Sequence, residues 1–282
     1  PVSRTSELAK KRERRSFRFR LIAFLGLLLI LMLAGLYQFW LRDSSLVSVK
    51  NLEIVGVSTK TEEGRQIDQA VRSAMGEMTT LNVDPGLLDQ ELARFPRVAS
   101  TEIKTKLPDS ATVTVVMRED GSIFGEGAGA LLIATDGTVL GPADGQESSL
   151  PLITDGDPPP ANGDSSGDGS AAGTTLTGRA LNQALILGAT PAAMRPYVKD
   201  SRSTPEGVVV TLDDGLTMLF GDAAHADQKW RAAAALIADP NFDTSGYVDL
   251  TVPRRPGVSS EVPDFSAGEA SVAGATDEPS AD

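Results

Sequence analysis

The side chains that could carry out chemistry are few in this sequence, and their spacing matches no complete catalytic motif. Residues 163–167 read G-D-S-S-G, which fits the G-x-S-x-G pattern of hydrolase nucleophiles at Ser165. That motif works because a strand-to-helix turn presents the serine to a histidine, and neither element is predicted beside this stretch. We therefore interpret the match as part of a flexible, low-complexity segment.

Histidine and cysteine are almost absent. The chain has one His, His225, and no Cys, which excludes thiol nucleophiles, disulfides and the usual zinc motifs. His225 stands just before a predicted helix, where an exposed or capping role is usual. Asp213 and Asp214 lack the ligand spacing of a calcium loop and are typical of a turn. The sequence thus predicts no catalytic residue, no metal site and no cofactor.

Charge is distributed unevenly along the 282 residues, whose formal net charge is −12. Residues 1–20 carry eight Lys or Arg against two acidic residues, whereas residues 43–282 carry 17 basic against 36 acidic residues. The acidic portion does not suit nucleic acid or anionic lipid as a partner. We interpret residues 1–20 as a cytoplasmic tail that sets topology and contacts lipid, rather than as a nucleic-acid site.

An apolar run from Leu21 to Leu41 follows the basic tail. Its 21 residues contain Gln38 as the only strongly polar one, and as a helix they would span about 30 Å, the thickness of a bilayer core. The run is longer than a signal peptide's and lacks a small-residue cleavage site, and a buried core helix would leave the flanking charges unexplained. We expect a single transmembrane helix with the N-terminus in the cytoplasm.

The region 46–119 has the pattern of a small α+β domain. An alternating segment opens it, Ile67, Ala70, Val71, Ala74 and Met75 recur at helical spacing, and Asp84-Pro85 begins a second helix that Pro96 ends. Two alternating strands, near 101–106 and 112–118, flank a turn at residues 107–109. The predicted order is strand, helix, helix, strand, strand.

Residues 120–255 are predicted to form a mixed β domain with flanking helices. Its signals are a turn at 136–137, a helix over 178–188, a hairpin over 208–220, a helix around Trp230 and a last strand over 246–252. Residues 154–178 are rich in Gly, Pro, Ser, Asp and Ala, so we expect a disordered insertion there. We also expect residues 256–282 to form a disordered acidic tail.

Several sequence segments occur in an order that resembles that of a known family. LEIVGV opens the first domain, LNVDPGLLDQELARFPRVASTEIKTKLPDSATVTVVMRE completes it, and ATDGTVL, LPLIT, EGVVVTLDDGLTMLFG, DQKWRAAAALI and GYVDLTVPRRPGV follow. Together they are similar to the FtsQ/DivIB family of bacterial cell division proteins. The resemblance implies a POTRA domain at 46–119 and the family's β domain at 120–255.

The resemblance further implies a non-enzymatic divisome protein at the septum of the cell membrane. It would bind FtsB/DivIC-like and FtsL-like single-pass partners outside the membrane and help to regulate the septal peptidoglycan synthase FtsW with FtsI. The family's partner contact falls at the last strand and the segment after it. The matching residues here are Tyr247, Val248, Asp249, Leu250, Thr251, Val252, Arg254, Arg255 and Val258.

Elementary backbone chemistry is compatible with that contact, because a C-terminal strand at a sheet edge has free N–H and C=O groups that a partner strand can complete. The alternative is a protected edge that Pro253 and Pro256 end. Two other functions are also open. One is a membrane-anchored POTRA protein of polypeptide transport, and the other is an anchored cell-wall enzyme that would have to use Ser165 or His225.

Overall fold

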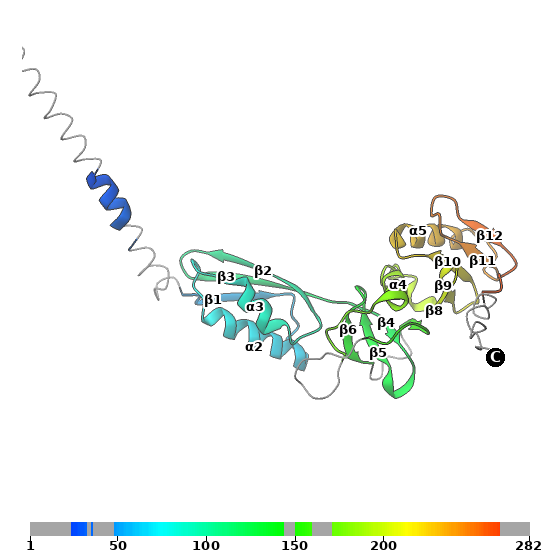
Figure 1. Ribbon diagram of the computed structural model, residues 1–282, viewed down its shortest axis with the longest axis horizontal. Helices are drawn as coiled ribbons and strands as arrows, with labels where there is room; N and C mark the ends of the chain where they lie inside the picture. The colour runs from blue at the N-terminus through cyan, green and yellow to red at the C-terminus, as the bar shows by residue number, and fades with distance from the viewer. Residues whose placement is uncertain (1–23, 33–34, 36–47, 144–149, 160–170, 266–282) are drawn as a thin grey trace, which may run out of the picture. The chain divides into compact units, whose positions relative to one another are not determined.

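A computed structural model describes residues 24–32, 35, 48–143, 150–159 and 171–265 of the chain (Figure 1). Residues 24–32 are helical. The predicted transmembrane run begins at Leu21 and ends at Leu41, both outside the described residues, as are the basic tail and the G-D-S-S-G stretch. No helix within the described ranges is both long enough and apolar enough to cross a membrane.

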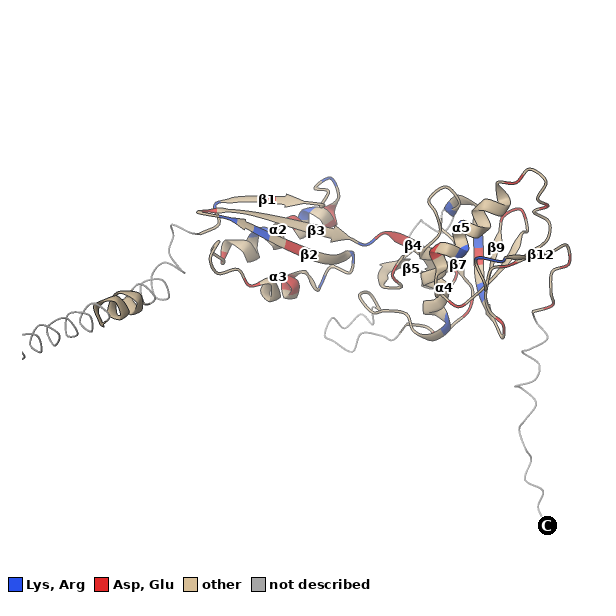
Figure 2. Ribbon diagram, turned by 90° about the horizontal axis from the view of Figure 1, so that it is seen from above, with Lys and Arg blue, Asp and Glu red and all other residues tan. Residues whose placement is uncertain are grey.

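Two compact units make up the chain, and each is described by itself. The first comprises the chain up to Leu92 together with Ser100–Val115, and the second comprises Ala93–Ala99 together with the chain from Val116 onward. Helices and both parallel and antiparallel strand pairs are present, so the predicted α+β class with mixed sheets is confirmed. Acidic and basic residues are interspersed over both units (Figure 2).

The first unit is a three-stranded sheet with two helices on one side (Figure 1). The sheet order is β1-β3-β2, with β1 parallel to β3 and Asn51 opposite Ser110. Along the chain the elements are β1 (Asn51–Val55), α2 (Glu62–Gly76), α3 (Pro85–Leu92), β2 (Val98–Lys106) and β3 (Ser110–Met117). The first residues of β2 and the last residues of β3 fall at the boundary between the two units.

Local sequence signals account for both helices of this unit. The Thr61 hydroxyl accepts a hydrogen bond from the Gly64 N–H at 3.1 Å, which satisfies one of the free donors at the start of α2. The Asp84 carboxylate accepts from the Gly86 N–H at 2.9 Å at the start of α3. The apolar stripe predicted on α2 is buried: Ile67, Ala70, Val71, Ala74 and Met75. The period therefore predicted α2 correctly, and Asp84-Pro85 predicted the start of α3, but α3 ends at Leu92 and not at the predicted Pro96.

The second unit is built on one nine-stranded sheet, in the order β12-β11-β10-β9-β8-β7-β4-β5-β6. Two helices, α4 (Gly178–Gly188) and α5 (Ala226–Ile237), pack on its core. The first strands are β4 (Asp120–Phe124), β5 (Leu131–Ala134), β6 (Val139–Pro142) and β7 (Leu152–Ile153). The later strands are β8 (Val198–Thr204), β9 (Gly207–Leu212), β10 (Thr217–Gly221), β11 (Tyr247–Asp249) and β12 (Gly257–Ser259). Short 3₁₀ turns occupy Gly127–Gly129 and Arg195–Tyr197.

The core between this sheet and its helices is centred on Trp230. Its indole N–H donates to the Ile186 carbonyl of α4 at 2.7 Å, and its ring lies 4.8 Å from that of Phe220 on β10. The hydrogen bond lets a large ring with one polar atom be fully buried without an unpaired donor. Trp230 thus joins α5, α4 and the sheet.

Three expectations about this unit are wrong in part. The predicted last strand, 246–252, ends at Asp249, because the chain turns away once the Leu250 N–H has donated to the Leu219 carbonyl. The tail expected to be disordered from residue 256 instead begins with β12, which pairs with β11. The ladder hydrogen bonds to β11 and the burial of Phe265 order this part of the tail despite its composition.

The insertion expected to be disordered over 154–178 is ordered at both described ends. The Asp155 carboxylate accepts from the Gln183 amide at 2.7 Å and from the Ser203 N–H at 2.9 Å. On the other side of the insertion, Leu176 is fully buried in the main core. These tertiary contacts supply the burial and hydrogen bonds that the local composition lacks.

Candidate partner-docking surface

The end of the nine-stranded sheet at β12 is where the predicted contact residues lie. β11 is parallel to β10 and antiparallel to β12, with Val248 opposite Val258. The strand expected at the edge, β11, is therefore an interior strand. β12 is the outermost strand, and within the described residues nothing pairs with its outer side.

Two of the nine predicted contact residues belong to the core. Val248 and Leu250 are buried in the cluster that packs under the helices. A partner could not touch their side chains unless the sheet opened. Their burial anchors the end of β11, after which the exposed residues follow.

Exposed apolar and basic side chains follow β11. Val252 and Val258 have exposed fractions of 58% and 57%, so each is more exposed than buried. Arg254 and Arg255 are also exposed, and neither makes an ion pair with another described residue. This segment therefore presents apolar surface beside positive charge in a chain that is acidic as a whole.

A compact turn holds that segment in place. The Asp249 carboxylate accepts from the Thr251 N–H at 2.9 Å and from its hydroxyl at 2.6 Å, and the Arg255 N–H donates to the Val252 carbonyl at 2.9 Å. Asp249 and Thr251 thus shape the backbone that presents Val252. Such a preformed turn lowers the conformational entropy that a partner must remove on binding.

Phe265, which the sequence reasoning missed, covers the opposite face of β9–β11. It packs on Val209 and Leu219, its ring lies 5.8 Å from that of Tyr247, and the Arg202 guanidinium lies 5.8 Å from its ring centre. Burial raises the pKa of Tyr247, and the negative charges of Asp249 and Glu206 add to this. As the only aromatic residue after position 255, Phe265 is itself the signal that could have revealed the contact.

A buried lysine stabilises an irregularity in β10 next to this surface. The register of β10 with β9 shifts between Leu219 and Gly221, and the Lys229 amine donates to the carbonyls of Phe220 at 2.8 Å and Asp222 at 2.9 Å. It also pairs with the Asp222 carboxylate at 2.9 Å, and that hydrogen bond lowers the pKa of Asp222. A cavity of about 460 Å³, with Thr251 and Lys229 on its wall, opens here.

The other edge of the sheet, at β6, is covered. The Val139 N–H donates to the Thr174 carbonyl and the Gly173 N–H donates to the Val139 carbonyl, both at 2.8 Å. A bridge between Thr138 and Thr175 continues this pairing. Backbone groups that an added strand would need at Val139 are thus already bonded within the chain.

The side chains considered for chemistry are not brought together. His225 is exposed, has a φ of 57° and precedes the first residue of α5. Asp214 accepts the Leu216 N–H at 3.1 Å, which agrees with the predicted turn. Within the described ranges, no three His, Cys, Asp or Glu side chains gather at a spacing that suits a metal ion.

Comparison with known proteins agrees with the family resemblance. No family model matches the chain. Over 201 residues the chain is 23% identical to the cell division protein FtsQ of Mycobacterium leprae (strain Br4923), a match that covers 71% of this chain and 54% of that protein. The chain thus spans about half the length of this curated relative. Its resemblance to the FtsQ/DivIB family is confirmed by this match.

Proposed function

We propose that this chain is a membrane-anchored, non-enzymatic cell division protein whose second unit binds a partner by strand addition at β12. The chain's similarity to a cell division protein supports a role in cell division. For the domains, we assign residues 46–119 to a POTRA domain and residues 120–255 to a β domain, with residues 21–41 as the anchor. The element order of the first unit supports the POTRA assignment.

The observation that carries the proposal is the difference between the two sheet edges. In β6 the N–H and C=O groups of Val139 are bonded to residues 173–174, whereas β12 has only β11 as a neighbour within the described residues. An open edge offers a row of main-chain donors and acceptors, which gives affinity to any extended segment. The edge that is open is the one that carries the exposed valines and the arginine pair.

The chemistry around β12 defines the partner segment that would fit. Val252 and Val258 favour apolar side chains at alternate positions, and Arg254 with Arg255 favours nearby carboxylates. We assign this role to an FtsB/DivIC-like partner, with an FtsL-like protein in the same complex. The complex would hold its members in register at the septum and thereby help to regulate the FtsW/FtsI synthase.

Capture of partners by the full chain in detergent tests the proposal. Val258→Asp places a charge on the open edge, and Val116→Asp makes the same change on β3 at a similar exposure of 50%. We expect Val258→Asp and Val252→Asp to lose the FtsB/DivIC-like partner while Val116→Asp retains it. Equal capture by Val258→Asp and the unaltered chain, with both folded by circular dichroism, contradicts docking at β12.

Cross-linking tests strand addition itself. The chain has no native Cys, so Val258→Cys introduces a single thiol. Scanning cysteines along the partner should then give disulfides at every second residue, because successive side chains of a strand point to opposite faces. A spacing of three to four residues would indicate a docked helix and would reject strand addition.

A further inference from the structure

One end of the first unit contains both the start of β1 and the turn between β2 and β3. Asn51 at the start of β1 lies opposite Ser110 at the start of β3, and the N–H groups of Lys50 and Asn51 both donate to the Asp109 carbonyl, at 2.8 and 3.1 Å. The 107–109 turn therefore sits beside the point where the chain enters the unit. We call residues 48–51 and 106–110 the entry end.

The entry end carries exposed apolar surface flanked by lysines. Leu107 has an exposed fraction of 62%, compared with 44% for Val55 and 48% for Leu87, the other exposed large apolar residues between 48 and 115. Lys50 and Lys106 are both exposed, and neither is ion-paired with a described residue. Apolar side chains next to lysines are typical of segments that rest at a membrane interface. Although residues 43–282 as a whole are too acidic to suit anionic lipid, the entry end carries two Lys against one acidic residue, Asp109, and so differs locally from the rest.

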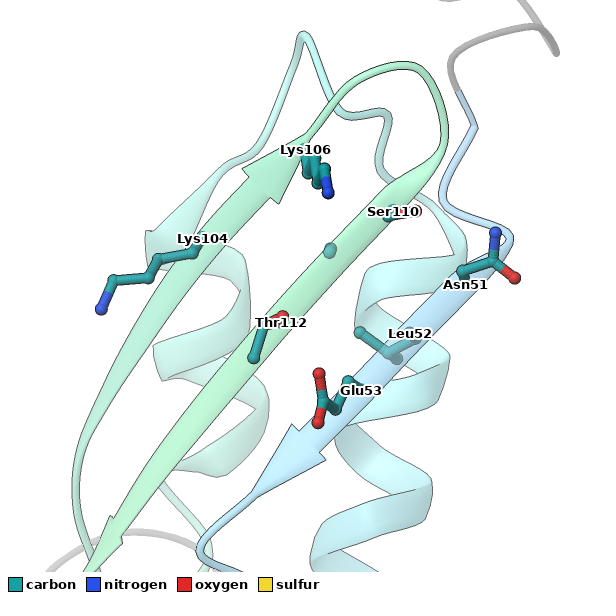
Figure 3. Close-up of a pocket in the computed structure, with 8 residues that line it drawn as sticks. Asn51, Leu52, Glu53, Lys104, Lys106, Ser110 and Thr112 are labelled. Carbon is teal, nitrogen blue, oxygen red and sulfur yellow. The ribbon is translucent and has the colours of Figure 1, made fainter.

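A hollow of about 410 Å³ lies on the open sheet face at this end (Figure 3). Lys104 and Lys106 line it from β2, Ser110 and Thr112 line it from β3, and Asn51 and Glu53 line it from β1. The Lys104 amine also pairs with Glu102 at 3.0 Å. Amines, hydroxyls and an amide are the donors that phosphate oxygens accept from, whereas the Glu53 carboxylate on the β1 side repels a phosphate, so the favourable side of the hollow is that of Lys104 and Lys106.

Chain length limits how far the entry end can lie from the proposed anchor. Residues 42–50 join the anchor to β1, and nine residues span about 30 Å when fully extended. Because β1 runs from Asn51 toward Val55, the entry end is the part of the unit that the tether reaches first. Because the proposed anchor lies in the bilayer, the short tether holds the entry end close to the bilayer surface.

We propose that the entry end rests on the outer surface of the anchoring bilayer, with Leu107 inserted among the lipid headgroups and Lys50 and Lys106 at the level of the phosphates. The hollow beside Lys106 would receive a lipid phosphate. This inference depends on the proposed anchor at 21–41 but not on partner docking at β12. It would orient the first unit relative to the membrane.

Depth-dependent fluorescence quenching tests this placement in the full chain. Leu107→Cys gives a single labelling site, and Val55→Cys, at the other end of β1, is the matched position about 13 Å farther along the strand. In proteoliposomes containing phosphatidylglycerol, nitroxide-labelled lipid should quench the probe at 107 several-fold more strongly than the probe at 55. Equal quenching at the two positions overturns the proposal.

Charge reversal separates lipid contact from simple tethering. With the probe at 107, Lys50→Glu combined with Lys106→Glu should abolish most of the quenching, whereas Lys60→Glu, beyond the far end of β1, should leave it unchanged. Quenching that survives the double variant, or that requires an added partner protein, overturns lipid contact.

Liposome flotation reports separately on the anchor. A chain that does not float refutes the anchor and this inference together. A chain that floats and captures its partners, yet shows equal quenching at 55 and 107, refutes this inference alone.

Discussion

The two edges of the nine-stranded sheet have similar backbone chemistry but opposite environments. At β6, backbone bonds from Val139 to residues 173–174 cover the start of the edge strand, and the neighbouring Leu176 is fully buried. At β12, the strand is exposed along its whole length and has one neighbour within the described residues. The comparison shows that protection of an edge can come from a segment whose composition alone predicts disorder.

A second difference concerns what holds each edge strand in place. β6 is fastened through the main core, because Leu176 and Val139 belong to the same buried cluster. β12 is held by its pairing with β11, whose Tyr247 packs against the small cluster around Phe265. The open edge should therefore be the less stable of the two, as is common for surfaces that bind partners.

The largest effect should come from breaking the covered edge. Leu176→Ala removes a fully buried side chain, and we expect it to lower the free energy of unfolding of the second unit by about 2–5 kcal/mol. Urea unfolding measures this, and hydrogen exchange should show faster exchange at the Val139 and Gly173 amides.

Val262→Ala is the matched truncation near the open edge, where the side chain is already partly exposed. Its effect should stay within about 0.5 kcal/mol. Equal effects of the Leu176 and Val262 truncations would show that the two edges do not differ in how they are fastened.

Removing the aromatic support of the open edge should have the next largest effect. Phe265→Ala deletes the ring that packs on Val209, Leu219 and Tyr247, and we expect a loss of about 2 kcal/mol. The Tyr247 and Asp249 amides should exchange faster, whereas those of β6 should not change. Phe265→Leu should restore most of the stability, and a uniform effect on both edges would contradict a local role.

A pair of glycines sharpens the comparison within the open edge. A Cβ at Gly246 would lie 2.4 Å from the Ser259 carbonyl oxygen, so Gly246→Ala must displace β12 at a cost of about 1–3 kcal/mol. A Cβ at Gly257 would meet only the Asp249 Cβ, at an ordinary 3.5 Å. Gly257→Ala should therefore be tolerated. The Gly246→Ala chain should also capture less partner than the Gly257→Ala chain. If Gly246→Ala captures as much partner as the unaltered chain, docking on a correctly placed β12 is contradicted.

The smallest effect concerns the acid limb of stability. The hydrogen bond from Lys229 lowers the pKa of Asp222 in the folded chain, so its stabilising contribution is present above the ordinary carboxyl pKa and is lost as pH falls through the lowered value. Asp222→Asn should make the urea midpoint fall less steeply with acidification. The effect should be modest, because the Asp222 side chain is 70% exposed. If the urea midpoints of Asp222→Asn and of the unaltered chain fall equally with pH, the Lys229–Asp222 pair does not contribute to stability in this way.

Local patterns predicted much of the fold because some elements are specified by nearby residues. The stripe from Ile67 to Met75 has a helical period and is buried as expected, and Asp84-Pro85 begins α3. The hairpin around Asp213 and Asp214 likewise follows from turn residues between apolar runs. These features need only a few neighbouring side chains to be decided.

Other features depend on residues distant in the sequence. β12 carries no apolar alternation of its own and forms because β11 offers it a ladder. Asp155 is ordered by Gln183 and Ser203, and no local pattern marks that contact. The contact set implied by the family resemblance is therefore mixed, since it includes Val248 and Leu250, whose side chains are buried in the core.

By itself, the sequence determined the α+β class, the helix faces, the main turns and the resemblance to a division family, because periodicity, turn residues and the order of strings are local or sequential properties. Only the tertiary structure decided which sheet edge is open, since backbone pairing between distant segments leaves no trace in composition. It also decided that Val252 and Val258 are exposed while Val248 is buried, because burial depends on which strands and helices become neighbours.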